Sequence, residues 1–110
     1  PTFTAQNLAA DNSYLDLDFA EAVYGDASAT EAVDATLGVS FTIAAGGSPS
    51  ITPTITSITK QNGNALVAGD SIIRLGLSGL QPAIGTESIT VTVKAGQVHD
   101  VYGNATAAPL

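Results

Sequence analysis

The chain has 110 residues, enough for one domain with a two-layer core and too few for two independent domains. Ten acidic residues against three basic ones give a formal net charge of −7. A field of that sign repels phosphate backbones and anionic lipid, so we expect no nucleic-acid partner and no membrane insertion. The absence of cysteine excludes disulfides, thiol catalysis and cysteine-type zinc sites.

The apolar residues are mostly Val, Ile, Leu and Ala, and only 5% of the chain is aromatic. With 13 Thr, this composition suits a pleated, half-buried surface and therefore favours strands. Charged residues make up only 12%, so hydroxyl groups must supply much of the polarity of the outer faces. Cysteine-free β-domains of this kind are common among secreted bacterial proteins, which points to an extracellular or cell-surface location.

Apolar and polar residues alternate with a period of two along most of the chain, which predicts strands. Turn residues separate these segments at intervals of roughly 8–12 residues, a spacing typical of an all-β sandwich. The predicted strands are Thr2–Leu8, Ser13–Phe19, Leu37–Ala44, Ile51–Lys60, Ser71–Leu77 and Glu87–Lys94, with a shorter segment at Ala65–Val67. The residues expected to form the core are Leu15, Leu17, Phe19, Val39, Phe41, Ile43, Ile72, Leu75, Leu77, Ile89, Val91 and Val93. Leu37 is also expected to point inward.

The fourth predicted strand carries two local signals. Its apolar positions shift from odd to even between Ile55 and Ile58, which predicts a bulge in between. Pro53 cannot donate to a ladder, so this end of the strand should lie at a sheet edge or at a strand start.

Two further segments are expected to lie between strands. Residues 46–49 read as a loop because they contain two glycines and a proline. Residues 26–36 are rich in Ala and acidic residues. Here we expect a short helical turn near residues 29–33, with an extended loop as the alternative.

Three segments of the chain match a pattern when taken in order. Leu15–Tyr24 follows the pattern apolar-x-apolar-x-Phe-Ser-Glu-x-Val, except that Ala20 replaces the serine. Gly69–Asp70 precedes a late strand, and Val98–Ala105 contains an Asp-x-x-Gly-Asn corner. In these segments the chain resembles bacterial immunoglobulin-like repeats of the Big or SwmB-like type. The acidic insert 26–34 has no counterpart that we can match to that family.

The resemblance implies an all-β fold: an immunoglobulin-like β-sandwich of about seven antiparallel strands in Greek-key order. Residues 1–110 are then a single domain, one module cut from a larger multi-domain protein. Such repeats build bacterial surface proteins, adhesins and the appendages of secreted enzymes. The expected function is therefore a non-catalytic structural or spacer module, with neighbouring immunoglobulin-like repeats as its partners.

The residues themselves offer little for catalysis. His99 is the only histidine, and no cysteine is available to pair with it. His99 and Asp100 are adjacent, so on an extended chain their side chains point to opposite faces. We therefore expect no enzyme, and we expect His99 to lie in solvent.

Calcium is the one cofactor to consider, because hard cations take oxygen ligands gathered from loops. The candidate ligands at predicted turns are Asp11, Asp26, Asp34, Asp70, Asp100 and Asn104. The alternative interpretation is that Asp and Asn in turns bind their own backbone, with Asp100 holding the Tyr-Gly-Asn turn.

The second function hypothesis is a calcium-dependent adhesive module that binds a cell-surface glycan or protein. Tyr14, Tyr24 and Tyr102 could supply aromatic faces to a sugar. The alternative is that Tyr24 and Tyr102 cover the edge of the core, with their hydroxyl groups on backbone. Carboxylates clustered in the loops would favour the adhesive module, and acidic residues spread over the surface would favour the spacer.

Overall fold

The computed structural model describes residues 5–9, 13–47, 53–79 and 87–105. These residues form six strands and no helix, and hence no helix that could cross a membrane. The strands are β1 (Ala5–Leu8), β2 (Tyr14–Asp18), β3 (Phe41–Gly47), β4 (Thr54–Thr59), β5 (Ile72–Ser78) and β6 (Glu87–Val93). The all-β prediction is confirmed. The short segment Ala65–Val67 is not a strand.

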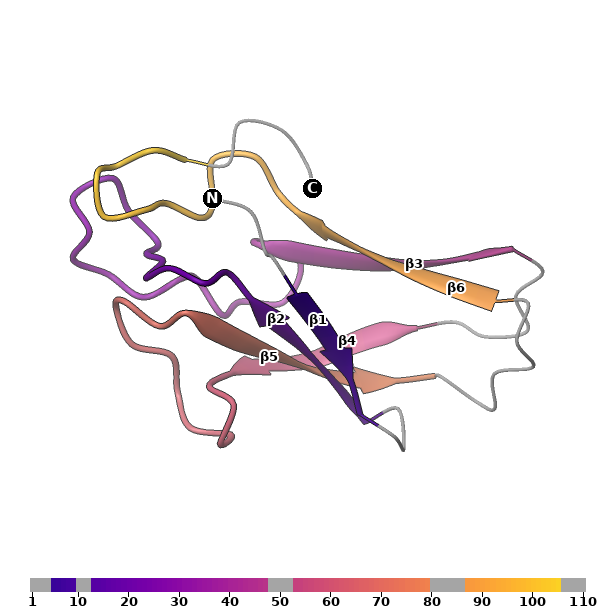
Figure 1. The fold of residues 1–110 in the computed structure, drawn as a ribbon. Coiled ribbons are helices and arrows are strands. Elements are labelled where there is room, and N and C mark those ends of the chain that lie inside the picture. Colours follow the sequence, from indigo (N-terminus) through magenta and orange to yellow (C-terminus); the bar gives the residue numbers. More distant parts are fainter. Residues whose placement is uncertain (1–4, 10–12, 48–52, 80–86, 106–110) are drawn as a thin grey trace.

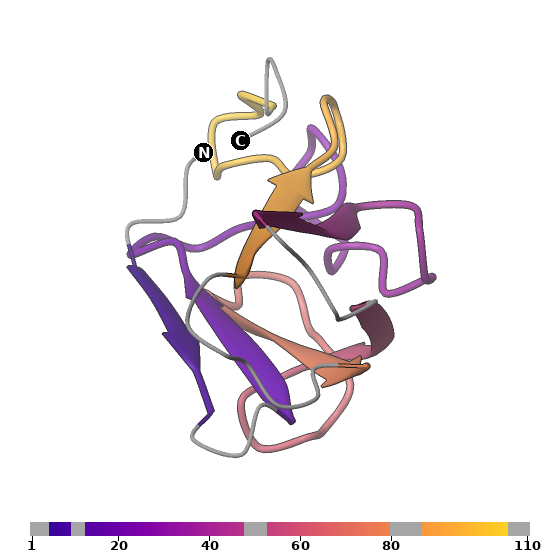
Figure 2. The same ribbon diagram turned by 90° about the vertical axis from the view of Figure 1, so that its right-hand side faces the viewer.

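The strands form two antiparallel sheets that pack against each other (Figure 1). One sheet has the order β1-β2-β5-β4, and the other contains only β3 and β6. Figure 2 shows the two-stranded sheet lying across the four-stranded one. One cluster of buried side chains joins them: Leu15, Leu17, Phe19, Val23, Val33, Phe41, Ile55, Ile58, Ile73, Leu75, Leu77, Val91, Val93 and Val98.

The pairing of β2 with β5 sets the faces of the larger sheet. Leu17 lies opposite Ile73, and both side chains are completely buried. Ile72 lies opposite Asp18, on the other face, and is half-buried. The expectation that Ile72 faces the core was therefore wrong, because the alternation that buries Leu75 buries Ile73 instead.

The two signals in the fourth strand are confirmed. The pairing of β4 with β5 shifts between Ile55 and Ser57, as expected for a bulge. The extra residue brings both Ile55 and Ile58 into the core although they are three positions apart. β4 is an edge strand, and Pro53 lies immediately before it, where no ladder hydrogen bond is lost.

The third strand begins and ends later than expected. Residues 37–39 form a turn, so Leu37 is 52% exposed and Val39 is only half-buried. The strand starts at Phe41 and continues through Gly47, paired with the start of β6, where the sequence predicted a loop. Alternation alone does not show where pairing begins, because a turn can carry the same apolar spacing.

The expected helical turn near residues 29–33 is wrong. The segment is a loop closed by Asp26, whose carboxylate accepts hydrogen bonds from Thr30 N–H at 2.9 Å and Glu31 N–H at 3.0 Å. Ala29 has a φ of 56°, which a right-handed helix does not allow.

The burial of side chains predicts that Leu→Ala lowers the free energy of unfolding much more at a buried position than at an exposed one. Leu17→Ala removes a fully buried side chain at the centre of β2 and should lower the free energy of unfolding by about 2–5 kcal/mol. Leu37→Ala changes an exposed side chain and should have an effect within about 0.5 kcal/mol. Urea unfolding followed by circular dichroism measures both, and similar losses would show that the burial is assigned incorrectly.

Candidate functional site

The three segments that carry the family resemblance meet at one end of the molecule, which we call the motif pole. It consists of residues 19–27, residues 67–71 and residues 98–105. Figure 1 shows these loops together on the left, beyond the ends of β2 and β6 and before the start of β5. The order of these segments can be read from the sequence, whereas their contact in space cannot.

Backbone hydrogen bonds through two residues join the three segments. Val23 N–H donates to Asp70 O, and Val23 O accepts from Gly69 N–H, both at 3.1 Å. Tyr24 N–H and His99 N–H each donate to the other residue's carbonyl at 2.8 Å. Val23 is completely buried, so its side chain also anchors the pole in the core.

Asp100 organises the corner at the end of the chain. One oxygen, Oδ1, accepts hydrogen bonds from Tyr102 N–H and Asn104 N–H, both at 2.9 Å. The other, Oδ2, accepts from the Asn104 side-chain amide at 3.0 Å. These bonds, with that from Asn104 first, hold the pKa of Asp100 below its ordinary value. The prediction that Asp100 holds the Tyr-Gly-Asn turn therefore agrees with the hydrogen bonds between Asp100, Tyr102 and Asn104.

The acidic insert uses its carboxylates in the same way. The Asp26 carboxylate also accepts a hydrogen bond from the Thr30 hydroxyl, and the pKa of Asp26 is lowered, mainly by that bond. Asp34 accepts from Thr36 N–H at 2.8 Å, and hydrogen bonding from Thr36 lowers its pKa. Each carboxylate stabilises the loop that contains it.

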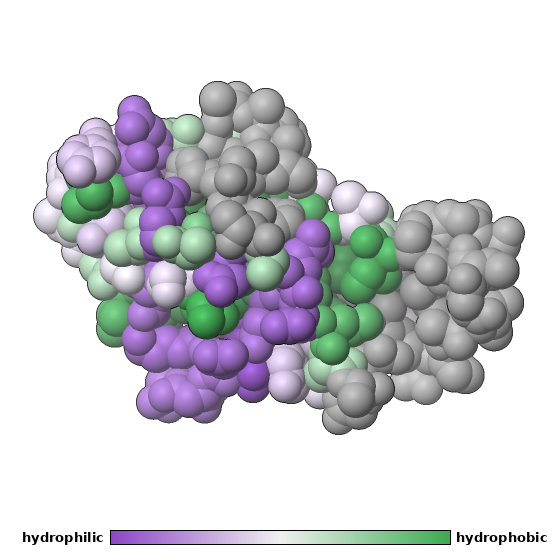
Figure 3. Space-filling view, viewed as in Figure 1, coloured by the Kyte–Doolittle hydropathy of each residue, from purple (hydrophilic) through white to green (hydrophobic). Residues whose placement is uncertain are grey.

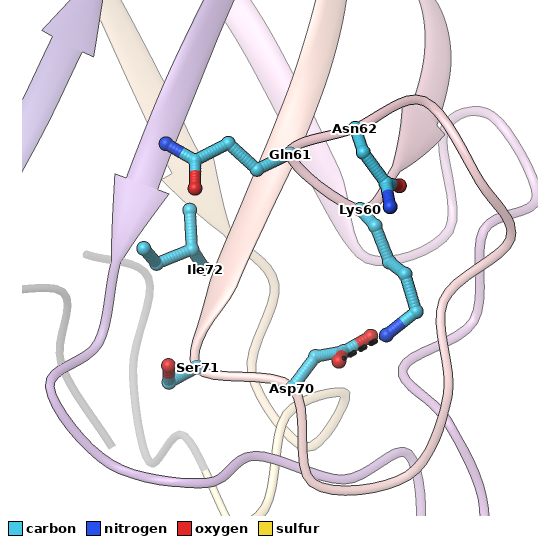
Figure 4. A pocket seen from close by; sticks show the side chains of 6 residues that line it. All are labelled: Lys60, Gln61, Asn62, Asp70, Ser71 and Ile72. Atoms are coloured by element: carbon cyan, nitrogen blue, oxygen red, sulfur yellow. Dashed lines mark hydrogen bonds and ion pairs between the residues drawn. The ribbon is translucent and has the colours of Figure 1, made fainter.

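Asp70 lines a shallow hollow of about 300 Å³, shown in Figure 4, together with Lys60, Gln61, Asn62, Ser71 and Ile72. Asp70 Oδ1 lies 2.7 Å from Lys60 Nζ, and Asp70 Oδ2 accepts a hydrogen bond from Val67 N–H at 2.8 Å. Both carboxylate oxygens are therefore occupied. The hollow is polar, but its two charged groups bind each other across it.

A cluster on the outer face of the larger sheet was not predicted from the sequence. Arg74 Nε lies 2.8 Å from Asp16 Oδ1, and Arg74 Nη2 lies 3.0 Å from Asp16 Oδ2. Gln61 Nε2 donates to the same carboxylate at 3.3 Å, and the guanidinium lies 3.5 Å from the centre of the Tyr14 ring. These hydrogen bonds to Asp16 raise the pKa of Arg74. The sequence places Tyr14 and Asp16 on one face of a strand, but only the pairing of β2 with β5 brings the one arginine, Arg74, next to them.

The calcium candidates that the structure describes do not gather into one cluster of carboxylates. Among the residues that the structure describes, no three His, Cys, Asp or Glu side chains form a group that could hold an ion. Asp26, Asp34, Asp70 and Asp100 each bind backbone N–H groups of their own loops. Asp11 lies outside the described residues.

Two expectations about single side chains were wrong. His99 is half-buried rather than in solvent, because its backbone pairs with both Tyr24 and Ala105. Tyr102 is 87% exposed and does not cover the core. Tyr24 lies against Gly69, and Arg74 lies over the Tyr14 ring.

The packing of the motif pole predicts a difference between two glycines. Gly103 and Gly96 both have positive φ, 86° and 79°. A Cβ at position 103 would lie 2.8 Å from Ala27 O, whereas one at position 96 would meet nothing within 4 Å. Gly96→Ala should therefore cost only the backbone penalty of about 1–2 kcal/mol. Gly103→Ala should cost a further ~1–3 kcal/mol, as in overpacked sites. Equal losses in urea unfolding would contradict the contact.

The lowered pKa values of the loop aspartates predict acid sensitivity. A carboxylate whose pKa is lower in the folded state stabilises that state above its unfolded pKa, and this stabilisation is lost as the pH falls through the folded value. The free energy of unfolding should therefore fall from about pH 5 downward. Asp100→Asn should flatten this slope compared with Glu21→Gln, which removes an equal charge from an exposed position. Identical slopes in urea titrations at several pH values would contradict this role of Asp100.

Comparisons with protein-family models, with curated proteins and with solved structures gave no match to this chain. The resemblance to bacterial immunoglobulin-like repeats therefore rests on the three short segments quoted above. Their meeting at the motif pole is a property of the structure.

Proposed function

We propose that the chain is a non-catalytic structural module of a bacterial cell-surface or secreted protein. In this proposal it is an immunoglobulin-like β-sandwich with a Greek-key strand order, one of several repeats. Its role is mechanical: it spaces neighbouring repeats and transmits force through its strands. Its partners are those repeats.

The observation that carries the proposal is the use made of the loop carboxylates. Those of Asp26, Asp34, Asp70 and Asp100 bind N–H groups within five residues of themselves. A ligand site keeps polar groups free to meet its ligand, whereas these groups already stabilise the turns that end the strands. These hydrogen bonds are expected of a domain whose loop carboxylates stabilise the loops themselves and do not bind a ligand.

The motif pole supports a mechanical role. Pulling on the chain near Tyr24 or His99 acts against two backbone hydrogen bonds that they exchange, each of 2.8 Å. Val98, next to His99, is completely buried in the core. The C-terminal corner is therefore fixed to the domain by both hydrogen bonds and apolar packing.

The environment of the lone histidine supports a non-catalytic role. Nδ1 of His99 is buried and has no hydrogen-bond partner among the described residues. A histidine that acts as a general base is normally oriented by one group and hydrogen-bonded to a nucleophile. His99 shows neither contact with the described residues.

Thermal unfolding separates the spacer from the calcium-dependent adhesive module. After EGTA treatment, millimolar calcium should leave the midpoint unchanged within error, and magnesium should act in the same way, because the described loop carboxylates are already hydrogen-bonded. A rise of several degrees with calcium alone would contradict the spacer proposal, since only a ligand of the folded state stabilises it. Asp100→Asn is the matched variant: a calcium-dependent rise lost in this variant would place the ion at the motif pole.

A further inference from the structure

The two sheets of the domain differ in width. One contains four strands and the other contains two. In Figure 2, β6 lies toward the side of β1, and β3 lies toward the side of β4. β3 contacts β4, whereas β1 contacts only β2 among the six described strands. The inner face of the larger sheet therefore extends past β6 on the β1 side.

The side chains of β1 show that this part of the inner face is not covered. Leu8 lies opposite Leu15, and Gln6 lies opposite Leu17, so all four point to the inner face. Leu15 and Leu17 are 3% and 0% exposed, whereas Leu8 is 45% exposed. On the inner face, the side chains of β2 are thus buried, whereas Leu8 on the neighbouring strand β1 is exposed. Figure 3, drawn in the same view as Figure 1, shows hydrophobic surface next to polar residues on this side of the molecule.

The neighbouring edge of β6 has hydrogen-bonding groups that no described strand binds. Lys94 N–H donates to Ser40 O at 2.9 Å, which makes these residues a hydrogen-bonded pair at the end of the β3–β6 ladder. Such pairs alternate in antiparallel sheets, so Thr90 and Thr92 also bond to β3. The N–H and C=O groups of Ile89 and Val91 then point to the opposite edge. Among the described strands, β6 pairs with β3 alone.

We propose that this edge of β6 is a docking site for an extended segment of a partner polypeptide. The segment adds a third strand to the β3–β6 sheet and covers Leu8 on the inner face of β1. Main-chain hydrogen bonds to Ile89 and Val91 provide affinity, and apolar side chains at alternate positions fill the uncovered face. This proposal does not depend on the spacer function.

Charge defines the chemistry of the partner. The chain carries −7 and only three basic residues, so an acidic strand would be repelled. The partner segment therefore has hydroxyl or basic residues between its apolar ones. A segment of about seven residues matches the length of β6.

One feature favours the edge of β6 over the edge of β4, and another favours a single strand over a second copy of the domain. The edge strand β4 is protected by Pro53 before it and by its bulge, two devices that prevent strand addition, whereas β6 contains neither. If two copies paired antiparallel through β6, their larger sheets would lie on the same side, and each larger sheet projects past β6 at β1. The two projections would occupy the same space, whereas a single strand fits.

Synthetic peptides test the proposal on the 110-residue chain. The probe is the capped peptide Lys-Thr-Val-Thr-Val-Thr-Val-Lys, and the control Lys-Val-Val-Val-Thr-Thr-Thr-Lys has the same composition without the alternation. Amide hydrogen exchange measured by NMR should slow at least tenfold at Ile89 and Val91 with the probe and remain unchanged with the control. Equal effects of the two peptides, or no slowing with either, would overturn the proposal.

A variant tests the edge itself. Ile89→Pro removes an N–H that points to the open edge and leaves the bonds of Thr90 and Thr92 to β3 in place, so it should abolish the response to the probe. A full response in this variant would overturn the proposal. Protection of Ile89 and Val91 in the chain without peptide would also overturn it. If that protection rose with protein concentration, a second copy of the domain would occupy the edge. If it did not change with concentration, residues of the same chain would occupy it.

Discussion

The pairing of Val23 and Tyr24 with two other loops is the constraint on which the rest of the domain depends. Val23 hydrogen-bonds to residues just before β5, in the larger sheet, and Tyr24 hydrogen-bonds to His99, which follows β6 in the smaller sheet. Two consecutive residues thus hold the ends of both sheets together. Because these contacts join backbone groups, they restrict the backbone conformation of neighbouring residues more than the identity of their side chains. Gly69 fits this requirement, with a φ of 90° where it lies against the Tyr24 ring.

The imbalance of charge explains how the loops are built. With ten acidic and three basic residues, most carboxylates cannot form an ion pair. Lys60 pairs with Asp70 and Arg74 pairs with Asp16. Other aspartates, such as Asp100, use backbone N–H groups, which carry partial positive charge and are otherwise unsatisfied in turns. An acidic composition is therefore compatible with stable turns, because backbone N–H groups of the described turns stabilise the carboxylates by hydrogen bonding.

The sequence predicted what depends on local chemistry and failed where distant residues decide. Alternation located the centres of β2, β4, β5 and β6, and the spacing of Ile55 and Ile58 located the bulge. The pair formed by Asp16 and Arg74 was not foreseen, because it depends on the register between strands 58 residues apart. The burial of His99 was missed for the same reason, since the segment that covers it, around Tyr24, is far away in the chain.

Six strands are described where about seven were expected, because the short segment Ala65–Val67 does not form a strand. An isolated pair of strands has little stability of its own, so β3 and β6 depend on the burial of side chains such as Phe41 and Val93 against the larger sheet. That burial fixes the inner face of β6 but leaves its edge groups without partners in the described strands. Alternation in a sequence identifies strands that a chain can form, whereas the width of a sheet is set by what its edges bind. The width of the smaller sheet is therefore the property that a partner strand can change without altering the core.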